Sequence, residues 1–174
     1  MNKEIIKRIF SYKFHLRGFF NPFINFQIAA MENYMGINEN KREIPIIVSL
    51  TSYEKRFKEL PITIYSLLNQ TLKPDKIILW LDKECSDLQY LPYELTQFIK
   101  NGLEIRFVKD LGVYTKSFYT FKEYSDSIIV TADDDIYYKK DWLKKLYLSY
   151  ISHPQDIHVH RAHKIKTCSD NSIA

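Results

Sequence analysis

The 174-residue chain has the length of one domain and is long enough to bury a hydrophobic core. Hydrophobic residues make up 45% of it and charged residues 26%, which is typical of a globular protein and excludes a disordered chain. The formal net charge is +4, and residues 1–20 alone carry that excess, so the remainder is close to neutral. A neutral body argues against a nucleic-acid-binding domain. No apolar run approaches the roughly 20 residues that a membrane span needs.

Residues 1–43 are predicted to be a basic and aromatic N-terminal segment followed by a polar linker. Its first part favours an amphipathic helix, with apolar residues at Ile5, Ile6, Ile9 and Phe10 and lysines at Lys3 and Lys7. Such a helix could contact an anionic membrane surface through residues 1–20, or it could pack on the domain or on a partner subunit. Two cysteines, Cys85 and Cys168, form no disulfide or metal framework. We therefore expect a cytoplasmic protein, with peripheral contact on the inner face of the plasma membrane as one alternative.

Residues 44–163 are predicted to alternate strands with helices, and residues 164–174 form a polar tail. Apolar runs indicate strands over 44–50, 76–82, 103–108 and 128–130, and an alternating pattern indicates a fifth over 157–163. Helices are expected over 60–68, from Pro92 to Asn101 with Leu95, Phe98 and Ile99 inward, over 115–124, and from an Asp141 cap to His153. This alternation predicts an α/β fold with a mostly parallel sheet and helices on both faces.

Three consecutive carboxylates, Asp133, Asp134 and Asp135, follow the run Ile128–Val130, which we expect to be a fully buried strand. Ligands of parallel α/β sheets bind just past the carboxyl ends of the strands. Adjacent carboxylates repel one another unless a cation or donor groups hold them, and Mg²⁺ commonly uses one or two carboxylates plus substrate phosphates. The triplet therefore indicates either a metal site for a diphosphate or an acidic turn before the next helix. The same edge is expected to gather Ser49–Tyr53 and Asp82.

Several other polar residues could have either a functional or a structural role. Lys116 follows Gly112 at a helix start, where it could meet a phosphate or simply be solvated. Asp110 precedes Leu-Gly, which is typical of a turn. His158 and His160 share one face of the predicted fifth strand, where they could bind a metal or be partly buried strand residues.

Four segments taken together resemble family-2-type glycosyltransferases of the GT-A (Rossmann-like) fold. They are 47–53 (IVSLTSY), 65–71 (YSLLNQT), 76–82 (KIILWLD) and the acidic triplet, which is similar to the family's Asp-x-Asp element. The Ser-Leu-Leu-Asn-Gln-Thr block is the most specific short match. The resemblance extends from about Ile44 to Leu148.

The resemblance implies an inverting, hexosyltransferase-like enzyme that takes a nucleotide-diphospho-sugar, with a UDP-sugar as the favoured donor. Thr51 and Tyr53 would flank the nucleotide, and Asp82 would contact its base or ribose. The triplet would hold the ribose and a Mn²⁺ or Mg²⁺ ion on the diphosphate, with Asp133 and Asp135 favoured as the literal Asp-x-Asp and Asp134 close behind. Bacterial surface polysaccharide synthesis is the usual setting of such relatives, with a glycan or lipid-linked acceptor.

The chain departs from the family in its length after the triplet. Relatives usually extend further, and that part supplies the acceptor pocket and, in inverting members, the general base. Asp170 is the only carboxylate after Asp156, so we expect a truncated donor-binding half without the general base. Two alternatives are a non-catalytic nucleotide-sugar-binding module and a nucleotidyltransferase. Resemblance to a nucleotidyltransferase would imply a glycine-rich loop after the first strand. Residues 49–56 contain no glycine, which argues against this second alternative.

Overall fold

Four parallel strands form one sheet in the order β3-β2-β1-β4. The computed structural model describes residues 36–85 and 91–162, so the predictions for residues 1–20, for position 163 at the end of the expected fifth strand, for Asp170 and for the polar tail lie outside the described residues. The strands are β1 (Ile46–Thr51), β2 (Lys76–Asp82), β3 (Leu103–Val108) and β4 (Ile128–Thr131).

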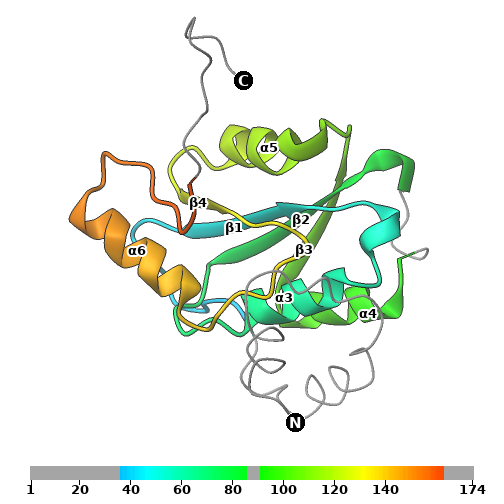
Figure 1. Ribbon diagram of the computed structural model, residues 1–174, viewed down its shortest axis with the longest axis horizontal. Helices are drawn as coiled ribbons and strands as arrows, with labels where there is room; N and C mark the ends of the chain where they lie inside the picture. The colour runs from blue at the N-terminus through cyan, green and yellow to red at the C-terminus, as the bar shows by residue number, and fades with distance from the viewer. Residues whose placement is uncertain (1–35, 86–90, 163–174) are drawn as a thin grey trace, which may run out of the picture.

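Helices cover both faces of the sheet, as predicted (Figure 1). On one face lie α3 (Leu60–Leu68) and α4 (Tyr93–Thr96), and α4 continues as the 3₁₀ helix η4 (Gln97–Asn101). On the other face lies α5 (Thr115–Glu123). The last helix, α6 (Trp142–Ser152), follows the loop after β4, and short 3₁₀ turns occur at η1 (Glu54–Arg56), η2 (Lys83–Cys85) and η5 (Gly112–Tyr114). None of the helices within the described ranges has the length and apolarity to span a membrane.

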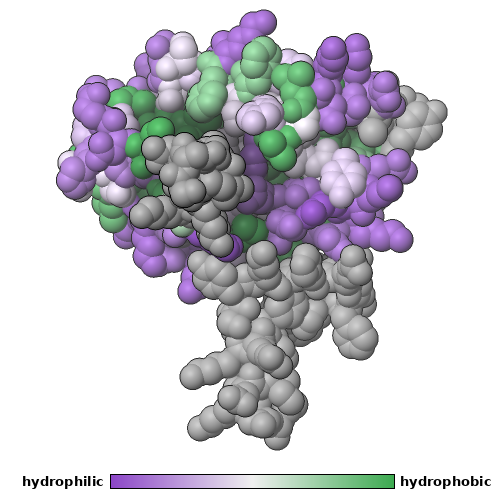
Figure 2. All heavy atoms as spheres, turned by 45° about the horizontal axis from the view of Figure 1, so that its top comes forward, coloured by the Kyte–Doolittle hydropathy of each residue, from purple (hydrophilic) through white to green (hydrophobic). Residues whose placement is uncertain are grey.

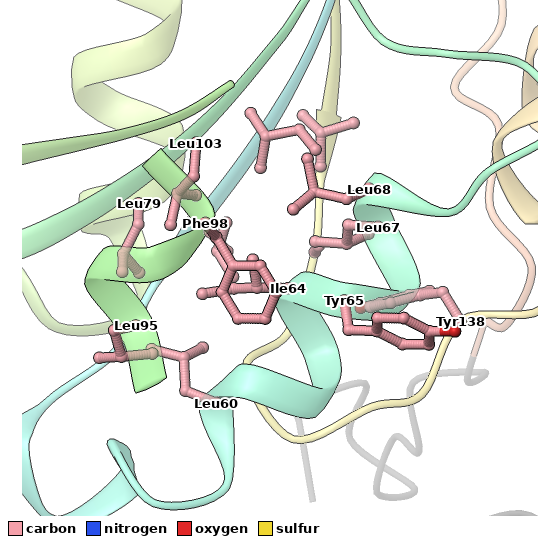
Figure 3. Packing of buried hydrophobic residues seen from close by; sticks show 14 of the residues in the cluster. Leu60, Ile64, Tyr65, Leu67, Leu68, Leu79, Leu95, Phe98, Leu103 and Tyr138 are labelled. Atoms are coloured by element: carbon pink, nitrogen blue, oxygen red, sulfur yellow. The ribbon is translucent and has the colours of Figure 1, made fainter. Parts of the chain in front are cut away.

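The core explains why the strands are continuously apolar. Alternate residues of β1 and β2 pack on opposite faces, because side chains of a strand point alternately to its two sides. Ile46, Val48, Leu50, Ile77, Leu79 and Leu81 join the cluster beneath α3 and α4, while Ile47, Ile78 and Trp80 join the one beneath α5. Figure 3 shows Ile64 and Leu67 of α3 close to Phe98 of η4, with Tyr65 beside Tyr138.

The strand register brings the carboxyl ends of β1, β2 and β4 to one edge. Thr51 is paired with Trp80 of β2, and Ser49 is paired with Thr131 of β4. The segments that follow these strands, which carry Ser52, Asp82 and the acidic triplet, therefore start from the same edge of the sheet.

Three predictions about packing are wrong. The β4 strand is not fully buried, because it is the edge strand of the described sheet: Ile128–Val130 are half-buried and Thr131 is exposed. Ile99 is 43% exposed rather than inward, since it lies in a 3₁₀ segment whose tighter period turns it away from the core. Residues 157–162 form no strand, and Ile157 is 94% exposed.

Asp141 is the N-cap residue of α6, as predicted, but its side chain makes no capping hydrogen bond and instead pairs with Lys145, one turn later, at 2.6 Å. The side chain that does cap this helix comes from Gln70, whose Oε1 accepts a hydrogen bond from the backbone N–H of Leu143 at 3.0 Å.

The outer side of α5 carries two exposed aromatic residues. Phe118 and Phe121 are 52% and 57% exposed. Hydrophobic residues accordingly appear among hydrophilic ones on this side of the molecule (Figure 2). The inward side of the same helix carries Tyr119, which packs against Trp80 with ring centroids 5.5 Å apart.

Candidate functional site at the carboxyl edge of the sheet

The three carboxylates after β4 have different partners. Asp133 Oδ1 lies 2.6 Å from Lys116 Nζ, and Asp134 Oδ2 accepts a hydrogen bond from Ser52 Oγ at 2.6 Å. Asp135 Oδ2 lies 2.8 Å from Arg56 Nη1. The exposed fraction of the side chain falls from 62% for Asp133 to 37% for Asp135 and 16% for Asp134. The outer two carboxylates are therefore the more accessible ones, while the central one faces inward.

Asp134 is held by both its side chain and its backbone. Its carbonyl accepts a hydrogen bond from Thr63 Oγ1 of α3 at 3.0 Å, and its second carboxylate oxygen lies 3.4 Å from Arg56 Nη1. Burial raises the pKa of Asp134 above its usual range, and the hydrogen bond from Ser52 opposes that rise. These contacts join the triplet to the segment after β1 and to α3.

Arg56 is the cation that joins Asp134, Asp135 and Tyr53. Its Nη1 is within 3.4 Å of an oxygen from each of the two carboxylates, and its Nε donates to the Tyr53 hydroxyl at 3.4 Å. The guanidinium carbon also lies 5.8 Å from the centre of the Tyr53 ring. The hydrogen bond to Asp135 raises the pKa of Arg56, so the group is a permanent cation.

Lys116 reaches the triplet from the first turn of α5. Its Nζ donates to the carbonyl of Ala132 at 3.0 Å as well as to Asp133, and only 16% of its side chain is exposed. A buried polar cluster under α5 sets its position. Ser49 Oγ donates to the carbonyl of Lys116 at 2.7 Å, and Trp80 Nε1 lies 3.0 Å from Ser49 Oγ and 2.8 Å from Thr120 Oγ1.

The loop after the triplet is fastened to α3. The backbone N–H of Asp133 donates to the Tyr138 hydroxyl at 2.7 Å, and the backbone N–H of Tyr138 donates to Ser66 Oγ at 3.0 Å. The Tyr138 ring packs on Trp142 with centroids 4.2 Å apart. Burial raises the pKa of Tyr138, so its hydroxyl stays protonated.

Gln70 and Thr71 continue this fastening beyond the end of α3. Gln70 Nε2 donates to the carbonyls of Ser66 at 2.8 Å and Lys139 at 3.0 Å, while its Oε1 caps α6. The backbone N–H of Thr71 donates to the carbonyl of Lys140 at 2.8 Å. Three polar residues of the Ser-Leu-Leu-Asn-Gln-Thr block, Ser66, Gln70 and Thr71, thus hold the loop that carries the triplet.

The remaining predicted site residues lie at the same edge: Tyr53 is joined to the triplet through Arg56, while Thr51 and Asp82 make separate local contacts. The Thr51 hydroxyl donates to the carbonyl of Trp80 at 2.9 Å, so it is turned back to the sheet. Tyr53 is 55% exposed and its ring is accessible. Asp82 is half-buried and accepts a hydrogen bond from the backbone N–H of Glu84 at 3.2 Å. The roles of these residues toward a ligand stay predictions.

Asp110 forms a turn, as one interpretation of its sequence predicts. Its Oδ1 accepts hydrogen bonds from the N–H of Gly112 at 2.8 Å and from Thr115 Oγ1 at 3.0 Å. Gly112 has φ +62°, a backbone conformation that favours glycine, and this lets the chain turn into α5 just before Lys116.

The two histidines do not share a face. His158 Nδ1 lies 2.8 Å from Ser149 Oγ and its Nε2 lies 2.9 Å from the carbonyl of His153. His160 Nε2 lies 3.0 Å from the carbonyl of Trp142. They pack against different parts of α6, so their spacing in the sequence does not bring them together at a metal.

A comparison with protein families matches the model of glycosyl transferase family 2 over residues 47–172. The match covers more than half of the chain. This protein belongs to glycosyl transferase family 2. Its four-stranded parallel sheet with helices on both faces agrees with the GT-A fold of that family. Among curated proteins no match is found.

Members of the family typically use a divalent metal, and the residues at this edge can be compared with the ligands that such a metal needs. Among residues 36–85 and 91–162, no three His, Cys, Asp or Glu side chains are grouped to hold a metal ion. However, one nitrogen of Arg56 is shared by Asp134 and Asp135, so oxygens of both carboxylates already converge on a single cationic atom. Carboxylate oxygens are the ligands that Mg²⁺ and Mn²⁺ prefer, so the residues at this edge fit a divalent cation held through one or two carboxylates.

Sequence reasoning located the triplet, Lys116 and the segment Ser49–Tyr53 at this edge, but it did not predict that Ser52 would hold Asp134, and it missed Arg56. Arg56 has no signal of its own, because it lies in a charged turn. Ser66 and Gln70 did have a signal. They are polar residues four apart, on or just after a helix that is otherwise apolar and buried.

Proposed function

We propose that this glycosyltransferase binds a nucleotide-diphospho-sugar, with a UDP-sugar as the favoured donor, together with Mn²⁺ or Mg²⁺ at the carboxyl edge of the sheet. The observation that carries the proposal is the convergence at that edge of a carboxylate triplet, two cations and an exposed tyrosine. They come from the segments after β1 and β4 and from the start of α5. This is where α/β sheets bind their ligands.

Each group has a part in the proposal. The cation, when bound through Asp135 and a neighbouring carboxylate of the triplet, would neutralise the diphosphate as the bond to the sugar breaks. Lys116 has its ammonium group at the edge, where two of its three N–H groups donate to Ala132 and Asp133, so the third is placed to donate to a phosphate oxygen. Tyr53 offers its ring to the nucleotide, and Asp82 offers an oxygen to the base or ribose. Asp134 also holds the loop in place, because one of its carboxylate oxygens accepts from Ser52 and its carbonyl accepts from Thr63, while its other carboxylate oxygen faces Arg56.

We further propose that the transferred sugar is a hexose, that transfer inverts the anomeric centre, and that the acceptor is a glycan or a lipid-linked sugar of bacterial surface polysaccharide synthesis. In this proposal the protein is cytoplasmic and its basic residues 1–20 contact the inner face of the plasma membrane. The excess of bases in that segment supports the contact.

The test of donor binding is calorimetry with UDP in the presence of Mn²⁺ and again with a chelator. We expect binding only with the metal. Replacing Asp135 with asparagine should weaken it by about 1–3 kcal/mol, because a charged contact is lost at a partly buried position. Asp126→Asn is the matched control, since Asp126 is an exposed carboxylate just before β4, and it should leave binding unchanged. Equal UDP affinity with and without metal would refute the metal's role.

Transfer itself is tested separately. A panel of nucleotide sugars is incubated with the protein and with candidate acceptors, and release of the nucleotide diphosphate is compared with formation of a glycosylated product. Product formation with one donor supports the enzyme. Metal-dependent UDP binding without any product across the panel fits a nucleotide-sugar-binding module, or the donor-binding half without a general base that the sequence predicts.

A further inference from the structure

A positive side chain lies where the proposed cation would be bound. Arg56 Nη1 is 2.8 Å from Asp135 Oδ2 and 3.4 Å from Asp134 Oδ1, while 31% of the arginine side chain is exposed. Two adjacent carboxylates that share one guanidinium nitrogen are held without any added ion. A divalent cation that used the same oxygens would therefore have to displace this contact.

The charges at the edge indicate how such a displacement could occur. The three carboxylates are opposed by Lys116 and Arg56, which leaves the cluster with one net negative charge. A divalent cation brought in alone would be bound beside Arg56 and repelled by it. A nucleotide diphosphate carries several negative charges, so it can accept the guanidinium as the metal takes the carboxylates. Arginine suits this exchange, because its planar fork pairs with carboxylate and phosphate alike.

The position of Arg56 favours the same exchange. Its guanidinium is hydrogen-bonded to the Tyr53 hydroxyl and lies near the Tyr53 ring, and that tyrosine is the exposed residue expected beside the nucleotide. One side chain thus spans the distance from the proposed nucleotide contact to the proposed metal contact.

We propose that Arg56 is an internal counter-ion that occupies the cation position of the metal-free site and passes to the diphosphate of the donor when the metal binds. The inference rests on the proposed function. It has a consequence of its own: the metal alone binds weakly, and metal and nucleotide diphosphate each raise the affinity for the other.

The first experiment measures Mn²⁺ alone. The full chain is titrated with Mn²⁺ and the free ion is followed by its electron paramagnetic resonance signal. We expect Arg56→Gln to bind Mn²⁺ alone about tenfold more tightly than the wild type, since a hydrogen bond to a charged group commonly corresponds to roughly a tenfold change or more. Lys55→Gln is the matched control. It removes the same charge from the adjacent, exposed residue of η1 and should change Mn²⁺ affinity less than about twofold.

The second experiment measures UDP at saturating Mn²⁺. Arg56→Gln should bind UDP about tenfold more weakly, because the guanidinium is no longer there to meet the diphosphate. Arg56→Lys keeps the charge but not the fork, and its affinity for Mn²⁺ alone should stay close to that of the wild type. In the wild type itself, UDP should raise Mn²⁺ affinity about tenfold or more, and this measurement needs no variant.

The outcomes separate the inference from the proposed function. If the wild type shows metal-dependent UDP binding but Arg56→Gln binds Mn²⁺ alone no more tightly, the counter-ion role is wrong while the proposed function stands. Absence of mutual enhancement between UDP and Mn²⁺ in the wild type would overturn the inference and the metal's role in the proposed function together, because it is the same result as equal UDP affinity with and without metal. If the wild type binds no UDP under any metal condition, the proposed function itself fails.

Discussion

Replacing Gln70 with leucine tests whether one buried amide fastens the loop after the acidic triplet. Gln70 is 2% exposed and makes three hydrogen bonds, to the carbonyls of Ser66 and Lys139 and from the N–H of Leu143. Leucine has a similar size but no polar atom, so it leaves these groups without their partner. An unsatisfied buried group costs about 1–3 kcal/mol. Allowing for partial access of water, we expect a loss of about 2–4 kcal/mol in the free energy of unfolding.

The assay is urea or thermal unfolding of the two proteins under the same conditions. For a chain of this size a loss of about 2–4 kcal/mol corresponds to a fall in Tm of roughly 4–16 °C. Gln97→Leu is the control, because Gln97 is half-buried and has one hydrogen bond, from its Nε2 to the carbonyl of Glu94. It should cost less than about 1 kcal/mol. If Gln70→Leu is no more destabilising than Gln97→Leu, the fastening has no energetic importance and the reasoning is wrong.

Four further measurements test other parts of the molecule. Ser49→Ala removes the hydroxyl shared by Trp80 and α5 and should cost about 1–3 kcal/mol in chemical unfolding. Burial raises the pKa of Asp134 in the folded protein. The stability that the protonated group contributes is therefore present below the unfolded pKa of about 3.9 and is lost as the pH rises through the folded pKa. Asp134→Asn should remove this decline from the free energies of unfolding measured over a pH series. Burial acts to raise the pKa of Glu104, but hydrogen bonds from Lys76 and Arg106 outweigh it, so the pKa is lowered. The stability that the ionised carboxylate contributes is therefore lost as the pH falls below about 4.3. Glu104→Gln should lower the free energy of unfolding at neutral pH and make it less dependent on pH on the acid side. Removal of residues 1–20 should abolish sedimentation with anionic vesicles and leave UDP binding intact, whereas loss of folding would show that the segment belongs to the core.

The strands show how far a local pattern can predict a fold. The predictions for 76–82 and 103–108 coincide with β2 and β3, because apolar runs bounded by turn residues have few other conformations that bury them. The run before the triplet has the same composition, yet β4 is half-exposed. Whether a strand has a neighbour on each side depends on the order β3-β2-β1-β4, which is a property of the whole chain. A single run of residues carries no information about that order.

The residues of the candidate site likewise include some that a local pattern could predict and some that it could not. The rule that ligands bind past the carboxyl ends of strands was sufficient to select Lys116 and the triplet, because it depends only on where strands end. It could not select Arg56, which lies in a turn beside Glu54 and Lys55 and is distinguished from them only by reaching carboxylates 78 and 79 positions later. Among several charged residues in one turn, only the three-dimensional structure shows which one meets the triplet.

The Ser-Leu-Leu-Asn-Gln-Thr block lies between these cases. Every residue of α3 is buried, and Gln70 just beyond it is buried too, so the sequence places polar Ser66 and Gln70 four residues apart in an apolar setting. Buried polar groups are stable only when hydrogen-bonded, which predicts that some other segment meets this face of the helix. The structure identifies that segment as the loop between the triplet and α6, through Tyr138, Lys139 and Leu143. The block that most clearly marks the family thus serves the site indirectly, since it holds in place the loop on which the carboxylates stand.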